Sequence, residues 1–209
     1  MKIRNPSLLI LSLLLLCSFI LLARSLDTVI VDTFDTQIIQ AIQLIKQPFL
    51  TLVMRFFSFI GDIIPVMIIS VILFIILYKV FHHRKELILF SIVLLGSTAF
   101  NIGLKAYYQR ERPTLYTMVT EESFSFPSGH SMAALSLYGI LTFLLWRHIP
   151  RQSGRIVLIT ISTFILLMIG VSRIYLGAHF PSDVLGAYLF SGFWLVFTIW
   201  GFKNFKLSS

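Results

Sequence analysis

Charged side chains are scarce in this sequence. Asp, Glu, Lys and Arg make up 12% of its 209 residues, whereas soluble domains carry about 25%. Hydrophobic residues account for 57%. So few polar side chains cannot cover a water-exposed surface, and the composition therefore excludes an ordinary soluble domain and predicts an integral membrane protein.

Cysteine and acidic residues are also few. Cys17 is the one cysteine, which excludes an internal disulfide framework, and no Cys and His residues have the spacing of a structural zinc site. Nine acidic residues stand against 17 Lys and Arg residues. In a membrane protein such an excess of cations is typical of topology signals, so nucleic-acid binding is not expected.

Long apolar runs dominate the sequence instead. A helix that crosses a membrane needs about 20 mostly apolar residues. Six stretches approach or meet this length, so the sequence predicts an all-α, polytopic membrane protein that forms a single domain over residues 1–209. The predicted spans are residues 7–23, 60–80, 87–104, 131–149, 156–172 and 184–202.

The first span has an alternative interpretation as a cleaved signal peptide, because Lys2 and Arg4 precede it. The run is long for the apolar core of such a peptide. At the candidate cleavage pattern, residues 21–23, a leucine stands where a small residue is needed. We therefore favour a retained membrane span.

The distribution of cations predicts the orientation. If the N-terminus is cytoplasmic, six spans return the C-terminus to the cytoplasm as well. The cytoplasmic segments then hold ten Lys and Arg residues, against seven in the outer segments. By the positive-inside rule this bias favours a plasma-membrane protein with both termini in the cytoplasm.

The long outer segment at residues 26–59 has apolar residues at roughly helical spacing, which predicts an amphipathic helix in the membrane interface. We expect Pro48 to break or kink this helix. A structural collar packed on the spans and a gateway for lipids are both open interpretations. The polar residues between the apolar positions are Asp32, Asp35, Gln40 and Gln43.

Six ionisable residues fall at the outer ends of the predicted spans. Such residues are costly at membrane depth and usually serve a function, so their convergence on one face predicts a functional site. They are Lys105 and Arg112 after the third span, His130 at the start of the fourth, Arg173 at the end of the fifth, and His179 and Asp183 before and at the start of the sixth.

These residue types suit a tetrahedral anion. Lys105, Arg112 and Arg173 supply positive charge, and guanidinium groups bind phosphate oxygens in pairs. Ser128 and Gly129 stand at the N-terminus of the fourth span, where free backbone N–H groups attract anions. The two histidines and the carboxylate offer an oriented base and a general acid. The set predicts a site for phosphoryl transfer.

The sequence around His179 also predicts its local geometry. Pro181 disfavours helix at the residue before it and suits the first position of a helix. His179 is therefore expected just outside the sixth span, with Asp183 in the first turn.

Other polar residues near these motifs have less specific interpretations. Arg110, Glu111, Glu121 and Glu122 are interpreted as solvated loop charges, with recognition of a lipid head group as the alternative. Asn101 in the third span is interpreted as an interhelical hydrogen-bonding residue rather than a ligand.

Three motifs in order carry a resemblance to a known family. Residues 105–113 match K-x6-R-P, residues 127–130 match P-S-G-H, and residues 172–183 match S-R-x5-H-x3-D. Together they resemble the type 2 phosphatidic acid phosphatase superfamily of integral-membrane lipid phosphatases. The sequence around His130 and Arg173 is similar to bacterial phosphatidylglycerophosphate phosphatase B-type enzymes, a group that overlaps with undecaprenyl-diphosphate phosphatases.

The resemblance implies a role for each matched residue. His179 would attack phosphorus and form a phosphohistidine, and Asp183 would orient it. His130 would protonate the leaving lipid oxygen and then activate water. The implied phosphate-binding residues are Lys105, Arg112, Ser128, Gly129 and Arg173.

The implied activity is hydrolysis of the terminal phosphate of a membrane lipid phosphate or diphosphate at the outer face of the membrane. Phosphatidylglycerophosphate, undecaprenyl diphosphate and phosphatidate are candidate substrates. Members of the family need no metal, so no cofactor is expected. The expected partners are the lipid substrate and the bilayer, with no obligate protein partner.

Two other functions remain open at this point. A lipid phosphotransferase would use the same phosphohistidine and pass the phosphate to a second alcohol. An anion or lipid-phosphate transporter would place its site near the middle of the membrane, whereas the centres of these spans are almost free of polar groups. The resemblance also reaches vanadium-dependent haloperoxidases, but those are soluble.

We expect phosphate release to continue in excess EDTA. The resemblance implies a metal-independent reaction, and three fixed cations would supply the positive charge that a metal ion supplies elsewhere. Phosphate release by detergent-solubilised protein, measured with and without EDTA, checks this prediction. Complete loss in EDTA that Mg²⁺ restores would contradict it.

Overall fold

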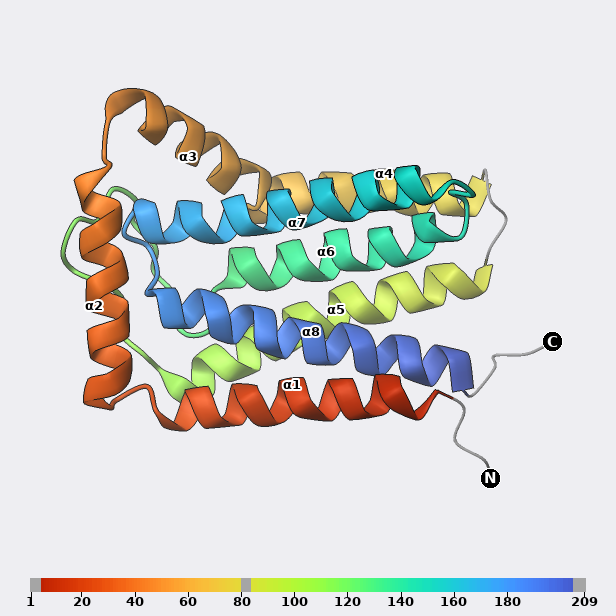
Figure 1. Ribbon diagram of the computed structural model, residues 1–209, viewed down its shortest axis with the longest axis horizontal. Helices are drawn as coiled ribbons and strands as arrows, with labels where there is room; N and C mark the ends of the chain where they lie inside the picture. Colours follow the sequence, from red (N-terminus) through yellow and green to blue (C-terminus); the bar gives the residue numbers. More distant parts are fainter. Residues whose placement is uncertain (1–4, 80–83, 205–209) are drawn as a thin grey trace.

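The computed structural model describes residues 5–79 and 84–204. Within these ranges the chain forms eight α-helices and no strand (Figure 1), which confirms the predicted all-α class. Five helices are long and apolar enough to cross a membrane. These are α1 (Pro6–Arg24), α5 (Arg84–Tyr108), α6 (Gly129–Trp146), α7 (Gln152–Tyr175) and α8 (Pro181–Asn204).

The second predicted span, at residues 60–80, is more complex than expected. Helices α3 (Pro48–Ile60) and α4 (Ile63–Lys79) are bent by 51° at a short break, and they meet the requirement for a span only when taken together. At the break, the Asp62 carboxylate accepts a hydrogen bond of 2.6 Å from the backbone N–H of Ile63. The chain therefore turns at Gly61 and Asp62, and the Asp62 side chain satisfies the first backbone N–H of the new helix.

The predicted amphipathic segment contains α2 (Val29–Leu44), and the predicted break at Pro48 is confirmed, because Pro48 is the first residue of α3. Helix α2 lies across one end of the bundle (Figure 1), and it packs against α7 and α8. One residue of its expected polar face behaves differently: Asp35 is 1% exposed and points into the protein. Its location in a membrane interface stays a prediction.

The helix directions alternate, so the turns that carry the three motifs meet at one end of the bundle. Figure 1 shows that α5 and α7 end, and that α6 and α8 begin, at the end of the bundle where α2 lies. Helix α1 begins and α8 ends at the opposite end. The topology thus brings the three motifs to one end, as the sequence predicts, whereas the side of the membrane on which this end lies stays a prediction.

An aromatic cluster holds the long loop between α5 and α6 against the bundle. Phe126 in this loop is fully buried and stacks on Phe19 of α1, with ring centroids 5.7 Å apart. Gly186 of α8 permits this packing, since a Cβ there would lie 2.5 Å from the ring of Phe126. The residues that follow Phe126 are therefore placed at the start of α6, beside the motif turns.

Candidate active site

His179 and Asp183 lie where the local sequence predicts. His179 stands in the turn before α8 and is 1% exposed, and Asp183 in the first turn of α8 is fully buried. Nδ1 of His179 is 3.4 Å from Oδ2 of Asp183 and 3.3 Å from the Ser125 hydroxyl oxygen. Because a carboxylate can only accept, this geometry places the ring proton on Nδ1 and leaves the lone pair on Nε2.

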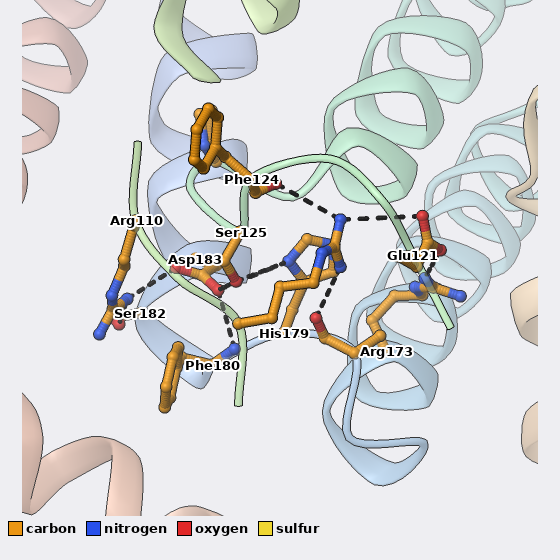
Figure 2. A network of polar contacts seen from close by, with 12 residues as sticks. Arg110, Glu121, Phe124, Ser125, Arg173, His179, Phe180, Ser182 and Asp183 are labelled. Atoms are coloured by element: carbon orange, nitrogen blue, oxygen red, sulfur yellow. Dashed lines mark hydrogen bonds and ion pairs between the residues drawn. The ribbon is translucent and has the colours of Figure 1, made fainter. Parts of the chain in front are cut away.

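The Asp183 carboxylate is itself held by several donors (Figure 2). Oδ2 accepts hydrogen bonds from the Ser125 hydroxyl and, at 2.8 Å, from the backbone N–H of Phe180. Oδ1 accepts one of 2.6 Å from Arg110. Both oxygens are therefore fixed, and the carboxylate cannot rotate away from the imidazole without losing these bonds.

Arg112 lies on the opposite side of the imidazole from Asp183. Its Nε donates to the Ser123 carbonyl at 2.6 Å, and its Nη1 donates to the Ala178 carbonyl at 2.7 Å. Nη1 is also 3.3 Å from Nε2 of His179. Two backbone carbonyls thus hold a fixed positive charge beside the nitrogen that carries the lone pair.

Glu121 bridges Arg112 and Arg173, which corrects its interpretation as a solvated loop charge. One carboxylate oxygen accepts a hydrogen bond from Arg173, and the other lies 3.7 Å from Nη2 of Arg112. Burial alone would raise the pKa of Glu121, but the charges of Arg173, His130 and Arg112 outweigh it and lower that pKa. The two arginines therefore already hold an anion.

Arg173 is almost completely buried at the end of α7. In addition to Glu121, it donates a hydrogen bond of 2.6 Å from Nη1 to the Ser58 hydroxyl of α3. Its Nε is buried and has no hydrogen-bond partner within the described part of the chain. This donor could therefore serve an incoming oxygen atom.

Arg110 is the second loop charge whose interpretation was wrong. It donates to Asp183 and, at 2.8 Å, to the Ser182 hydroxyl, and its Nη2 lies 3.0 Å from Oδ2 of Asp35. No sequence signal predicts these contacts, because a charged residue at an unspecified position of a loop motif has the same local pattern whether it is solvated or buried. The burial of Asp35 on α2 could be recognised only once the fold was known.

Lys105 and the start of α6 complete the cluster. Nζ of Lys105 lies 3.1 Å from the Ser123 hydroxyl oxygen and also donates to the Phe124 carbonyl. Ser128 is the N-cap of α6, and its buried hydroxyl has no hydrogen-bond partner among the described residues. Asn101 of α5 donates to the Pro127 carbonyl at 3.2 Å, so it holds this turn, in line with its predicted hydrogen-bonding role.

His130 follows Gly129 in the first turn of α6. Its Nε2 is 3.8 Å from Oδ1 of Asp62, at the bend between α3 and α4. The N-cap residue Ser128 and Gly129 directly precede it, so His130 stands at the helix start that completes the cluster. The structure thus gathers all the residues that the motifs single out at one end of the bundle, whereas their catalytic roles stay predictions.

The described residues of this cluster suit an anion better than a metal ion. Within residues 5–79 and 84–204, no group of three His, Cys, Asp or Glu side chains is placed to hold a metal. The cluster instead gathers Lys105, Arg110, Arg112 and Arg173, and the helix N-terminus adds backbone N–H groups. Positive charge in this site therefore comes from side chains.

Sequence and structure comparisons agree with this arrangement. Residues 85–206 match the model of the PAP2 superfamily. The chain therefore belongs to the PAP2 superfamily, and the predicted family, phosphatase assignment and multi-pass membrane class are confirmed.

Individual relatives extend the similarity to most of the chain. Phosphatidylglycerophosphatase B of Bacillus subtilis (strain 168) is 35% identical over 192 residues, which cover 89% of this chain and 91% of the relative. The crystal structure of the transmembrane PAP2 type phosphatidylglycerolphosphate phosphatase from Bacillus subtilis has a TM-score of 0.81 and 35% identity, and the match covers 94% of this chain and 97% of that one. Aquifex aeolicus LpxE, at 21% identity, shares the fold with a TM-score of 0.64 over 78% of this chain and 93% of its own.

We expect Glu121→Gln to strengthen the inhibition of the enzyme by inorganic phosphate about tenfold. The neutral amide competes less well for Arg112 and Arg173 than the carboxylate does, because charge-assisted hydrogen bonds are stronger than neutral ones. The measurement is the competitive inhibition constant of phosphate in a steady-state assay.

The adjacent Glu122 provides the matched control, since it is exposed and Glu122→Gln changes the same charge next to the site. An inhibition constant that stays unchanged or rises in Glu121→Gln would show that Glu121 does not compete with the phosphate.

We expect the imidazole of His179 to remain neutral down to about pH 4. Burial lowers the pKa of His179 to about 4, against the opposing effect of Asp183. Since Asp183 raises this pKa, Asp183→Asn should lower it further. NMR titration of ¹⁵N-histidine-labelled protein measures both values, and a pKa near that of a solvated histidine, about 6.5, would contradict the prediction.

Proposed function

We propose that this protein is a metal-independent lipid phosphatase that acts through a phosphohistidine on His179. The observation that carries the proposal is the placement of Nε2 of His179, with Asp183 on one side and Arg112 on the other. This arrangement combines an oriented nucleophile with a fixed cation where the charge of a phosphate would develop.

The anion site is supported by its present occupant. The Glu121 carboxylate lies between Arg112 and Arg173, and a phosphate group would make the same kind of contacts with the two guanidinium groups. The substrate would displace Glu121 and gain two further contacts, from the Ser128 hydroxyl and from Nε of Arg173, which lack partners among the described residues.

In the first step, Nε2 of His179 attacks phosphorus, and the bond from phosphorus to the lipid oxygen breaks. His130 gives its proton to that oxygen, so the lipid leaves as an alcohol. The phosphorylated ring carries positive charge, which the Asp183 carboxylate stabilises through Nδ1–H. Lys105, Arg112 and Arg173 hold the phosphate oxygens during the transfer.

In the second step, water attacks the phosphohistidine. His130 accepts a proton from the water, the bond between phosphorus and Nε2 breaks, and inorganic phosphate leaves. Both histidines return to their starting protonation states. The two steps use the same anion site, so no second phosphate-binding site is required.

We infer phosphatidylglycerophosphate as the first substrate to test. The support is the relative that carries this name and that matches about nine-tenths of the chain at 35% identity. Undecaprenyl diphosphate and phosphatidate present a similar terminal phosphate and are the comparison substrates. A panel of the three lipids in mixed micelles, compared by kcat/KM, ranks them.

We further propose that the site faces the outside of the cell and that α2 lies in the membrane interface. The sequence supports this orientation, because the segments predicted to be cytoplasmic hold ten Lys and Arg residues against seven in the predicted outer segments. Exposed apolar residues on α2, such as Val29, Ile30 and Phe34, support contact with lipid.

We expect His179→Ala to lower phosphate release from phosphatidylglycerophosphate by at least about 10³-fold, because the covalent route disappears. Release of inorganic phosphate in mixed micelles is the measurement. Acid-labile, base-stable labelling of the protein by a ³²P-substrate tests the intermediate in parallel.

His148→Ala is the matched control, because His148 is exposed and follows the C-terminal end of α6, whereas the site lies at the N-terminal end of that helix. Near-normal turnover of His179→Ala would remove His179 as the nucleophile. Transfer of the label to an added lipid alcohol in place of free phosphate would favour a phosphotransferase.

A further inference from the structure

We propose that Arg110 and Asp35 form a positioning pair that holds the Asp183 carboxylate in place behind His179. The inference rests on the proposed function, because it concerns how Asp183 serves His179. Neither residue is one that the motifs specify: Arg110 occupies an unspecified position of the first motif, and Asp35 lies on α2, which joins the site through this pair. The active site therefore depends on a helix outside the part of the chain that carries the motifs.

The contacts form a continuous chain from α2 to the imidazole, and Figure 2 shows its part from Arg110 to His179. Arg110 donates to Oδ1 of Asp183 at 2.6 Å, while Oδ2 of the same carboxylate faces His179. The other arm of the guanidinium lies 3.0 Å from Oδ2 of Asp35. Arg110 thus contacts the carboxylate oxygen that the histidine leaves unused, and it acts on His179 only through Asp183.

The Arg110 guanidinium has contacts on its flat face as well as at its two terminal nitrogens. Its central carbon lies 4.2 Å from the centroid of the Phe180 ring, within the range of a cation–π contact. Nη1 also donates to the Ser182 hydroxyl at 2.8 Å. With contacts on its face and on both arms, Arg110 has few alternative positions.

Asp35 connects the pair to the N-terminus of α8. It accepts a hydrogen bond of 2.8 Å from the backbone N–H of Ser182 and a second from the Ser182 hydroxyl. The first N–H groups of a helix have no partner within the helix, so Asp35 acts as a cap supplied by another helix. Asp35 therefore fixes both Arg110 and the helix turn that carries Asp183.

The charges of the pair also matter to the chemistry. Arg110 without Asp35 would cancel the charge of Asp183, since one cation and one carboxylate sum to zero. With Asp35 the three groups carry one net negative charge next to His179. This net charge favours the positively charged ring of a phosphohistidine in a buried site.

A double-mutant cycle with Asp183 tests the proposal. The variants are Arg110→Gln and Asp35→Asn, each made in the wild-type protein and in Asp183→Asn. The rate of phosphoenzyme formation is measured in single turnover with the ³²P-labelled lipid that the panel ranks first. We expect each variant to lower this rate about 10- to 100-fold in the wild-type protein, in line with loss of a hydrogen bond to a charged group.

In Asp183→Asn, the same substitutions should change the rate less than about threefold, because the carboxylate on which they act is gone. Equal losses in both backgrounds, or no loss in the wild-type protein, would overturn the proposal. Arg110→Lys keeps the positive charge but has a single nitrogen in place of the two that contact Asp183 and Asp35. This variant should therefore recover part of the rate that Arg110→Gln loses. If Asp35→Asn does not fold, the double-mutant cycle of Arg110→Gln with Asp183→Asn still tests whether Arg110 acts through Asp183.

Asp32→Asn is the matched control on α2, because Asp32 is exposed on the same helix and should leave the rate unchanged. Thermal unfolding in detergent identifies variants that are merely unstable. The absence of any phosphoenzyme in the wild-type protein would overturn the proposed function itself. If the wild-type protein forms the phosphoenzyme but the substitutions lower the rate equally with and without Asp183, the proposed positioning pair is overturned and the proposed function is not.

Discussion

The structure depends on one constraint: a charge that is buried at the end of an apolar helix bundle needs a partner of opposite sign. An isolated buried charge is very costly, whereas a paired and hydrogen-bonded one is tolerated. Every Asp, Glu, Arg and His side chain that is buried in the described part of the chain contacts such a partner. The pairs are Asp35 and Asp183 with Arg110, His179 with Asp183, Arg173 with Glu121, and Glu86 with Arg147.

This constraint explains why segments outside the motifs reach the site. The ends of α5, α6, α7 and α8 bring more cations than carboxylates, and the remaining partners come from elsewhere. Helix α2 supplies Asp35, the end of α3 supplies the Ser58 hydroxyl, and the bend before α4 supplies Asp62. The segment from α2 to the bend therefore acts as a collar that completes the polar network of the site. A gateway for lipids through the same segment is compatible with this role.

Sequence reasoning succeeded where one physical rule dominates. Apolar length identified the spans, Pro48 and Pro181 marked the starts of α3 and α8, and the motif spacing selected residues that the fold gathers. It failed where the result depends on tertiary contacts. Arg110 and Glu121 look like solvated loop charges, and Asp35 fits the polar face of an amphipathic helix. Their burial follows from the crossing of α2 over the bundle end, which no local pattern encodes.

The two carboxylates that the sequence did not assign to the site differ in how firmly they are held. Asp35 is 1% exposed and accepts hydrogen bonds from both Arg110 and Ser182, so displacing it would also uncap α8. The Glu121 side chain is 27% exposed and contacts Arg112 and Arg173, the two arginines of the proposed phosphate site. In the proposed reaction a lipid phosphate replaces Glu121 without leaving Arg112 or Arg173 unpaired, whereas no group of the proposed reaction replaces Asp35. The same rule of charge pairing thus makes one carboxylate exchangeable and the other part of the permanent frame.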